Sequence, residues 1–397
     1  MIDESVLRKS VRHIYLFFVI AAVLSFLYAI VKNRLNGDFL GVEVTLPFWL
    51  LLLNLIFSIL PFFLTWRVYL YFNRRAIKRR ITIPITFFGC FLAAIIIWNI
   101  IVTIIFGVGV MGAPPYEAPS YIKPIIQIMN RFNAYYGVFL YFLLVPKKNK
   151  TQFILVIMAL VLAYLRAGLG LFLYLAMFGY LKYFIEISSF IKKQKMVVIT
   201  LLCLFPILFS GLYELRNTLR NQESTEAITD PIFGVLVGRL SSFSDSAFIL
   251  QEAPYFFLGA KNLDSFYFQK QALGGVISQD FMPEIRPEIM LFKFYYENSE
   301  DNVAYMAGTQ GNLYLSLFHS GFTFFLNLTT IILFIYITFY VFRLLRFNYS
   351  NEMAFILLLY VLMSGVSNEY AFLIFSIFIY LFLFLIVNLL GNLKNNN

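Results

Sequence analysis

Residues 81–106 read ITIPITFFGCFLAAIIIWNIIVTIIF, a stretch that contains no charged side chain. A helix that crosses the hydrocarbon core of a bilayer needs about 20 consecutive apolar residues, so this stretch predicts a transmembrane helix. The whole chain has a matching composition, because 60% of its 397 residues are hydrophobic and only 13% are charged. Soluble domains carry about 25% charged residues, and disordered chains are poor in the aromatic side chains that make up 19% of this one. Both of those classes are therefore excluded.

Apolar runs of this kind recur along the chain and are separated by short polar segments. Because only helices and closed barrels satisfy their backbone hydrogen bonds within lipid, runs of this length predict helices. The sequence therefore predicts an all-α polytopic membrane protein with about ten transmembrane helices. The ten runs cover residues 13–31, 41–66, 81–106, 125–145, 152–165, 169–190, 196–213, 312–342, 353–367 and 370–390.

Basic side chains gather between these runs, from Arg8, Lys9 and Arg12 before the first to Lys394 after the last. With a cytoplasmic N-terminus, every basic cluster falls on the cytoplasmic side of the ten-helix arrangement, as the positive-inside rule requires. Both termini are then cytoplasmic. Contact with anionic lipid accounts for the net charge of +10, so no nucleic-acid partner is expected. The first run is longer than the apolar part of a signal peptide and no cleavage site follows it.

One long segment interrupts the membrane pattern, from residue 214 to residue 311. Residues 214–310 contain 13 acidic and 7 basic side chains, whereas the rest of the chain contains 8 and 24. Loops of such length are uncommon and are usually functional, and this one is studded with Phe and Tyr. We therefore predict a folded, partly helical extracytoplasmic loop at 214–311. It separates an N-terminal bundle of seven transmembrane helices (1–213) from a C-terminal bundle of three (312–397).

Two segments of this loop place an arginine in a defined setting. The pair Asp230-Pro231 is typical of a helix start, and it predicts a helix over 232–250. On that helix Arg239, Ser242 and Ser246 would form one polar stripe, which suits either an interfacial helix or an arginine aimed into a cavity.

The second arginine of the loop is Arg286, which lies between Pro283 and Pro287. Proline restricts the residue before it to extended geometry, so the segment should be stiff. A stiff segment loses less entropy when it holds a guanidinium against a ligand. The alternative is a surface turn whose arginine pairs with Glu284 or Glu288.

Ionisable residues within the apolar runs are the next signal, because such groups usually face a protein interior or a water-filled cavity. Arg166 and Glu369 fall at the outer ends of their runs, and the topology puts both on the membrane face that carries the loop. Arg131 lies near an outer end too, where a snorkelling side chain is the simpler interpretation. His319 follows the loop directly and is either a structural group or a catalytic base.

Familiar soluble-enzyme motifs are missing from the sequence. It contains no phosphate-binding Gly-rich loop with Lys, no nucleophile elbow, and no HExxH or CxxC spacing. With two histidines and two cysteines, a conventional zinc site is not expected, although carboxylates could hold a divalent ion. Arginines at the outer membrane surface make bidentate contacts to phosphate oxygens, and aromatic rings stack on sugar faces. A sugar linked to a lipid pyrophosphate would use both.

This combination of features resembles the bacterial O-antigen or oligosaccharide repeat-unit polymerases, the Wzy family. Members have many transmembrane helices, two cytoplasmic termini and one large periplasmic loop in the C-terminal half. The resemblance covers the whole chain as topology but only short segments as sequence. These segments are Leu165-Arg166-Ala167-Gly168, Gly238-Arg239-Leu240 with Asp245 and Gln251-Glu252, Pro283-Glu284-Ile285-Arg286-Pro287, and Gly308-Thr309-Gln310-Gly311-Asn312-Leu313-Tyr314 with Ser320-Gly321.

The resemblance implies a glycosyltransferase of the GT-C kind in the bacterial inner membrane, with its loop in the periplasm. Its reaction would transfer a growing glycan from undecaprenyl pyrophosphate to the non-reducing end of an incoming lipid-linked repeat unit. The family is thought to invert the anomeric carbon without a metal, and no cofactor is implied. The implied pyrophosphate-binding residues are Arg166, Arg239 and Arg286, and the candidate bases are Glu252, Asp245, His319 and Glu369.

The implied partners are the undecaprenyl-pyrophosphate-linked oligosaccharide, the lipid bilayer and a chain-length-regulating co-polymerase. Three other functions fit parts of the same pattern. An O-antigen ligase shares the layout but transfers the glycan to lipid A core, and His319 after the loop would suit it. A lipid-linked oligosaccharide flippase should show repeat-like halves and no long loop. A non-catalytic assembly or receptor protein is the third.

Overall fold

The protein is an all-helical bundle. The computed structural model describes residues 4–74, 83–110, 117–147, 149–166, 168, 170–197, 200, 204, 231–295, 307–345 and 347–395. Within these ranges there is no β-strand, and the only bridge of that kind joins Arg34 to Glu43. The predicted all-α class is therefore confirmed for the described residues.

Five described helices are long and apolar enough to cross a membrane, and a sixth span results if the bent pair α7 and α8 is counted as one. Their outer faces carry large apolar side chains that water would not tolerate, such as Phe17, Ile56 and Ile104. The protein is thus a multi-pass membrane protein. The span-length helices are α1 (Glu4–Lys32), α2 (Phe48–Asn73), α3 (Ile85–Phe106), α16 (Gly321–Leu344) and α18 (Ser367–Asn395).

Several predicted runs form shorter or broken helices instead. The run 125–145 is interrupted between Arg131 and Ala134, the run 312–342 is interrupted at Ser320, and α7 bends by 88° into α8. Most of the predicted run 196–213 lies outside the described residues. The shorter helices are α4 (Lys123–Arg131), α5 (Ala134–Leu144), α6 (Lys150–Leu165), α7 (Gly170–Lys182), α8 (Phe184–Lys193), α15 (Gly308–His319) and α17 (Ser350–Ser364).

The described part of the large loop consists of short helices joined by turns. Its helices pack onto the bundle, with α10 on α1, α11 on α2 and α15, and α13 on α18. The loop elements are α10 (Pro231–Arg239), α11 (Phe243–Gln251), α12 (Ala253–Ala260), α13 (Tyr267–Val276), the 3₁₀ turn η2 (Gln279–Phe281) and α14 (Pro287–Tyr295).

The single helix predicted over 232–250 is wrong. It is broken between α10 and α11 at Ser242, whose φ of +53° lies in the left-handed region and stops helical hydrogen bonding. The Ser242 hydroxyl donates to the backbone oxygen of Met363 at 3.0 Å, so a tertiary contact supports the break. Ser246 bonds back to the Ser242 carbonyl at 3.0 Å instead of joining a polar stripe with Arg239. The residues between the two prolines, Pro283 and Pro287, form no helix, in agreement with the prediction.

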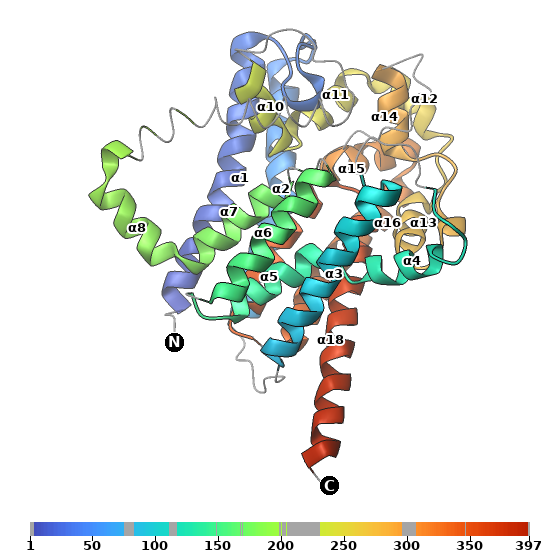
Figure 1. The fold of residues 1–397 in the computed structure, drawn as a ribbon. Coiled ribbons are helices and arrows are strands. Elements are labelled where there is room, and N and C mark those ends of the chain that lie inside the picture. The colour runs from blue at the N-terminus through green and yellow to red at the C-terminus, as the bar shows by residue number, and fades with distance from the viewer. Residues whose placement is uncertain are drawn as a thin grey trace.

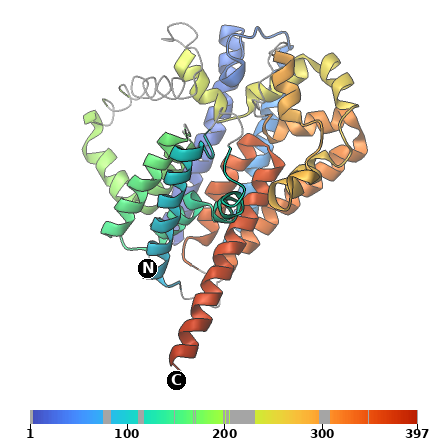
Figure 2. The same cartoon turned by 45° about the vertical axis from the view of Figure 1, so that its right-hand side comes forward.

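Figure 1 shows both chain termini at the lower end of the molecule and the loop helices α10, α11, α12 and α14 at the upper end. The loop after α1, which contains the 3₁₀ turn η1 (Gly37–Phe39), lies at the same upper end and contacts α10 and α11. Figure 2 shows the C-terminal half of α18 extending below the other helices. The N-terminal half of α18 is the part that packs among them, against α13, α16 and α17.

The tightest crossing in the bundle joins the start of α15 to the end of α17. A Cβ atom added at Gly365 would lie 2.1 Å from the backbone carbonyl carbon of Gly308. The φ angle is +66° at Gly308 and +68° at Gly365. Such φ values favour glycine because it has no Cβ. Asn312 completes the crossing, because its side-chain amide donates to the Gly365 carbonyl at 2.8 Å.

We expect the substitution Gly365→Ala to lower the free energy of unfolding by at least about 1–3 kcal/mol, because the left-handed φ and the backbone overlap both oppose a methyl group. Gly179→Ala is the matched control, since Gly179 lies inside α7 and a Cβ there has no neighbour within 4 Å. The thermal midpoint of each purified variant in detergent provides the measurement. Equal midpoints for the two variants would contradict the proposed constraint.

Candidate functional site

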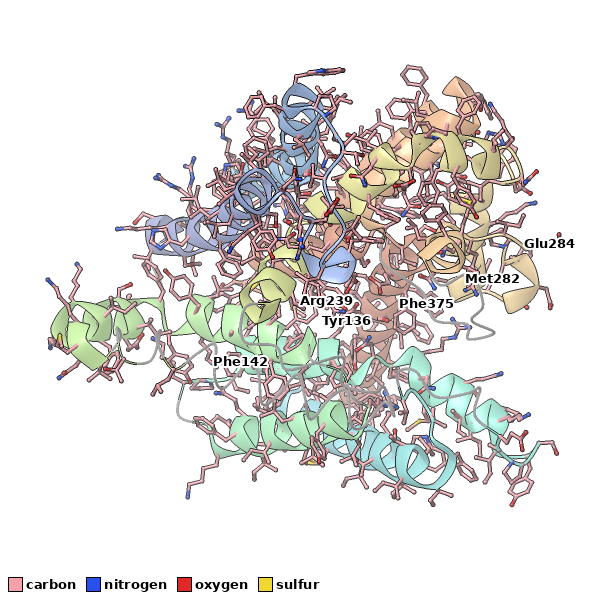
Figure 3. The ribbon with its side chains drawn as sticks, turned by 90° about the horizontal axis from the view of Figure 1, so that it is seen from above. Tyr136, Phe142, Arg239, Met282, Glu284 and Phe375 are labelled. Carbon is pink, nitrogen blue, oxygen red and sulfur yellow. The ribbon has the colours of Figure 1, made fainter. Side chains whose placement is uncertain are left out.

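A cavity of about 430 Å³ lies where the helix ends of the bundle meet the loop. Its wall combines the starts of α5, α7 and α18, the end of α6, the turn after α3 and the end of α13. Figure 3 looks down on this region and shows Tyr136, which lines the cavity, near the centre of the molecule. The lining residues are Gly109, Asn133, Tyr135, Tyr136, Ala163, Arg166, Gly168, Gly170, Leu171, Tyr174, Gly275, Tyr360, Asn368, Glu369 and Phe372.

Arg166 supplies the positive charge of the cavity. It follows the last residue of α6, and two acceptors on α3 fix its guanidinium. Its Nε donates to the Thr103 hydroxyl at 3.1 Å, and one Nη donates to the Asn99 side-chain oxygen at 2.7 Å. The turn after α3 covers the group closely, because a Cβ added at Gly109 would lie 3.0 Å from the Arg166 Nε. The guanidinium is thereby oriented before any ligand arrives.

Glu369 supplies the negative charge of the same cavity. It lies in the first turn of α18, and its carboxylate accepts a short hydrogen bond from the Ser364 hydroxyl at the end of α17. The intervening Gly365 is the glycine that crosses Gly308, so that crossing sets where α18 begins. The prediction that Arg166 and Glu369 lie at the same membrane face is thus extended, since both line one cavity.

The remaining wall is rich in tyrosine and has unused hydrogen-bonding capacity. Tyr135, Tyr136, Tyr174 and Tyr360 present aromatic rings of the kind that stack on sugar faces. The Tyr174 hydroxyl and the Asn368 side-chain oxygen are buried and have no hydrogen-bond partner among the described residues. A buried polar atom without a partner costs about 1–3 kcal/mol, so both atoms destabilise this part of the wall.

One wall of the cavity belongs to the loop. Gly275 at the end of α13 packs so closely on α18 that a Cβ there would lie 2.5 Å from the Asn368 Cβ. One turn earlier Gln271 accepts from the Ser367 hydroxyl at 2.9 Å and donates to the Glu288 carboxylate at 2.8 Å. Burial raises the pKa of Glu288, and its second oxygen has no described partner. This chain of hydrogen bonds connects α14 to the first residues of α18.

Arg239 and Asp245, two of the residues proposed from the sequence, lie together outside this cavity. Arg239 ends α10 and forms an ion pair with Asp38, with its Nε 2.7 Å from the Asp38 Oδ1. Asp245 is buried in the first turn of α11. Burial and the neighbouring charge of Asp38 raise the pKa of Asp245, and the Arg239 charge offsets part of that shift.

The other proposed residues are separate from the cavity as well. Glu252 lies at the junction of α11 and α12, where the Gln251 amide is 3.5 Å from its carboxylate. His319 ends α15, and its Nδ1 is 2.9 Å from the Thr323 hydroxyl. Arg286 immediately precedes α14 and pairs with neither Glu284 nor Glu288 among the described ion pairs. Of the seven proposed residues, only Arg166 and Glu369 line the cavity.

Sequence reasoning missed the acceptors on α3 and the tyrosines of the wall. Asn99 gave a usable signal, because it is an isolated amide within a run of otherwise apolar residues. The tyrosines gave none, since the chain contains 26 of them and only their place in the fold separates these four from the rest.

Comparisons with protein-family models, with curated proteins and with solved structures found no match for this chain. Among the described residues, no three His, Cys, Asp or Glu side chains gather closely enough to hold a metal ion. The chemistry of the cavity is therefore inferred from its own side chains, which offer one guanidinium, one carboxylate, amides and aromatic rings.

The raised pKa of Asp245 predicts a pH dependence of stability. A carboxyl group whose pKa is higher in the folded state stabilises the fold below its normal pKa, and that contribution is lost as the pH rises through the raised value. We expect Asp245→Asn to reduce the loss of thermal stability that the wild type shows from about pH 5 to about pH 9.

Asp264→Asn is the matched control for that measurement. A hydrogen bond from Lys270 lowers the pKa of Asp264, so its contribution is lost toward acid pH and not toward alkaline pH. Thermal midpoints measured across the pH range in detergent will distinguish the two variants. If the thermal midpoint of Asp245→Asn falls toward alkaline pH as steeply as that of the wild type, the prediction is contradicted, and Asp245 is ionised in the folded protein.

Proposed function

We propose that this protein polymerises lipid-linked oligosaccharide repeat units, as the resemblance to the Wzy family implies. The observation that carries the proposal is the pairing of Arg166 and Glu369 in one tyrosine-lined cavity. A guanidinium suits the pyrophosphate of a lipid-linked donor, and aromatic rings with amide groups suit its sugars. The cavity is lined in part by Gly275 of the loop helix α13, so it adjoins the segment that we propose to be periplasmic, where a lipid headgroup would sit.

In the proposed reaction, a hydroxyl at the non-reducing end of the incoming repeat unit attacks the anomeric carbon of the growing glycan. Glu369 takes the hydroxyl proton as the new glycosidic bond forms. The bond between the anomeric carbon and the pyrophosphate oxygen breaks, and undecaprenyl pyrophosphate departs with the electron pair. Arg166 stabilises the negative charge that develops on the leaving group. Attack opposite to the leaving group inverts the anomeric carbon.

The proposal includes the ten-helix topology, with both termini in the cytoplasm and residues 214–311 in the periplasm of a bacterium. The common end of the two termini in Figure 1 supports an even number of spans. The donor and acceptor are undecaprenyl-pyrophosphate-linked oligosaccharides, and a chain-length-regulating co-polymerase is the proposed protein partner. No metal or nucleic acid takes part in the proposed reaction.

The deciding experiment supplies purified protein in lipid with undecaprenyl-pyrophosphate-linked repeat units, with and without EDTA. The proposal predicts a ladder of products that survives EDTA. A ladder that disappears with EDTA would overturn the metal-independent mechanism but keep the polymerase. Transfer that requires lipid A core would identify a ligase, and movement of the lipid-linked unit across the bilayer without transfer would identify a flippase.

We expect Glu369→Gln to slow chain elongation about 100-fold or more, because the amide cannot accept the acceptor proton and general base catalysis contributes about 10²–10⁴-fold. Glu117→Gln is the control, since Glu117 is exposed and lies outside the cavity. The measurement is the rate of ladder formation at equal amounts of folded protein. Normal elongation by Glu369→Gln, with loss in Glu252→Gln or His319→Gln, would move the base to one of those residues.

The loop arginine Arg239 requires a paired test, because its ion pair with Asp38 gives it a structural role as well. If Arg239 also binds pyrophosphate, we expect Arg239→Gln to reduce elongation about tenfold or more, which is the usual cost of a lost charge-assisted hydrogen bond. Asp38→Asn breaks the same ion pair but keeps the arginine, and it should retain most of the activity. Equal losses in the two variants would assign Arg239 to the fold alone.

A further inference from the structure

A second guanidinium is bonded to a residue that lines the cavity, and its surroundings differ from those of a simple snorkelling side chain. Arg131 is the last residue of α4 and is half-buried. One Nη donates to the backbone oxygen of Gly275 at 3.3 Å, and the guanidinium lies over the Phe375 ring at 5.6 Å from its centroid. It therefore bridges α13 and α18, the loop helix and the transmembrane helix that pack against each other.

Both of these anchors belong to the rim of the cavity. Gly275 lines the cavity itself, and Phe375 lies three residues beyond Phe372, which also lines it. Asn133, two residues after Arg131, also lines the cavity. Its side-chain oxygen caps α5 by accepting a hydrogen bond from the Tyr136 backbone N–H at 3.1 Å.

The guanidinium also keeps most of its hydrogen-bonding capacity. Arginine has five N–H donors, and only the bond to Gly275 is formed within the described part of the chain. No carboxylate in that part forms an ion pair with Arg131. A half-buried guanidinium with open donors and a fixed position is suited to bind an oxyanion.

Apolar side chains near Arg131 are exposed, so we expect this side of the protein to face the bilayer. Tyr121, just before α4, is 74% exposed, and Ile128 within α4 is 62% exposed, as expected for an interfacial helix. Below Phe375, exposed apolar side chains continue along one face of α18 toward its C-terminal end. They are Phe378, Phe382, Leu385 and Leu389. A lipid whose headgroup reached Arg131 could therefore keep its tail against apolar protein surface.

From these contacts we infer that Arg131 is a second phosphate-binding residue, which holds one phosphate of a lipid diphosphate while Arg166 holds the other. The inference rests on the proposed function, because it assigns the ligand of the same cavity to the class of polyprenyl diphosphates. Two separate guanidinium groups, one within the cavity and one at its lipid-facing rim, would favour a diphosphate over a monophosphate.

The test measures binding of geranylgeranyl diphosphate and geranylgeranyl monophosphate to the full-length protein in nanodiscs of zwitterionic lipid. We expect the wild type to prefer the diphosphate. Arg131→Gln should weaken diphosphate binding about tenfold and leave monophosphate binding nearly unchanged. Arg131→Lys should recover part of the affinity through its charge, and Arg166→Gln should weaken the binding of both lipids.

Arg67→Gln is the matched control, because Arg67 also lies over an aromatic ring, that of Phe63 at 6.0 Å, and is not part of the cavity. Wild-type diphosphate affinity in Arg131→Gln would overturn the inference and leave the role of Arg166 intact. Equal weakening for both lipids in Arg131→Gln would also overturn it, since that result would reflect damage to the cavity. If the wild type binds neither lipid, the proposed function fails with it.

Discussion

The crossing of Gly308 and Gly365 is the constraint on which the functional region depends. Two backbones in contact leave no room for any side chain, so α15 and α17 can meet there only through glycine. The Asn312 amide and the contact between the Thr309 and Tyr370 hydroxyls, 3.0 Å apart, then fix the start of α18 relative to α15. Glu369 lies within that start, so the position of the cavity carboxylate follows from the close approach of two glycine backbones.

The bilayer imposes a second constraint, because polar groups in its interior must find partners within the protein. Lys182 shows how fully this can be met. It is buried, and its ammonium donates to the Val145 carbonyl at 2.9 Å and to the Gln152 side chain at 2.6 Å. Arg166 is held in a similar way by Asn99 and Thr103. Lys182 and Arg166 are thus both held by hydrogen bonds to other parts of the bundle.

Two polar atoms of the cavity wall lack a hydrogen-bond partner, as do six other buried side-chain atoms of the described residues. The Tyr174 hydroxyl and the Asn368 oxygen are buried close to groups that are otherwise satisfied, and they lie on the wall that also carries Arg166 and Glu369. The loop contributes to the same wall through Gly275 on α13. Loop and bundle therefore share one hydrophobic core and one cavity. The boundaries at residues 214 and 311 separate segments of different composition, but the described residues on either side pack together.

The amino-acid sequence by itself determined the helical class and the membrane setting, because both follow from long apolar runs along the chain. It also predicted Arg166 and Glu369 at one membrane face, because the predicted topology fixes the side on which a helix end emerges. Helix breaks such as the one at Ser242 were beyond it, because the break depends on a hydrogen bond to Met363, which is 121 residues away.

The cavity could be decided only by the tertiary structure. Local pattern did not distinguish Arg166 from Arg239 and Arg286, but packing brought only Arg166 to the cavity wall that also holds Glu369 and four tyrosines, and it paired Arg239 with Asp38. The physical reason is that the shape of this cavity depends on the distances between helix ends. Those distances are set by close contacts such as Gly308 with Gly365 and Gly275 with Asn368, whose partners lie far apart along the chain.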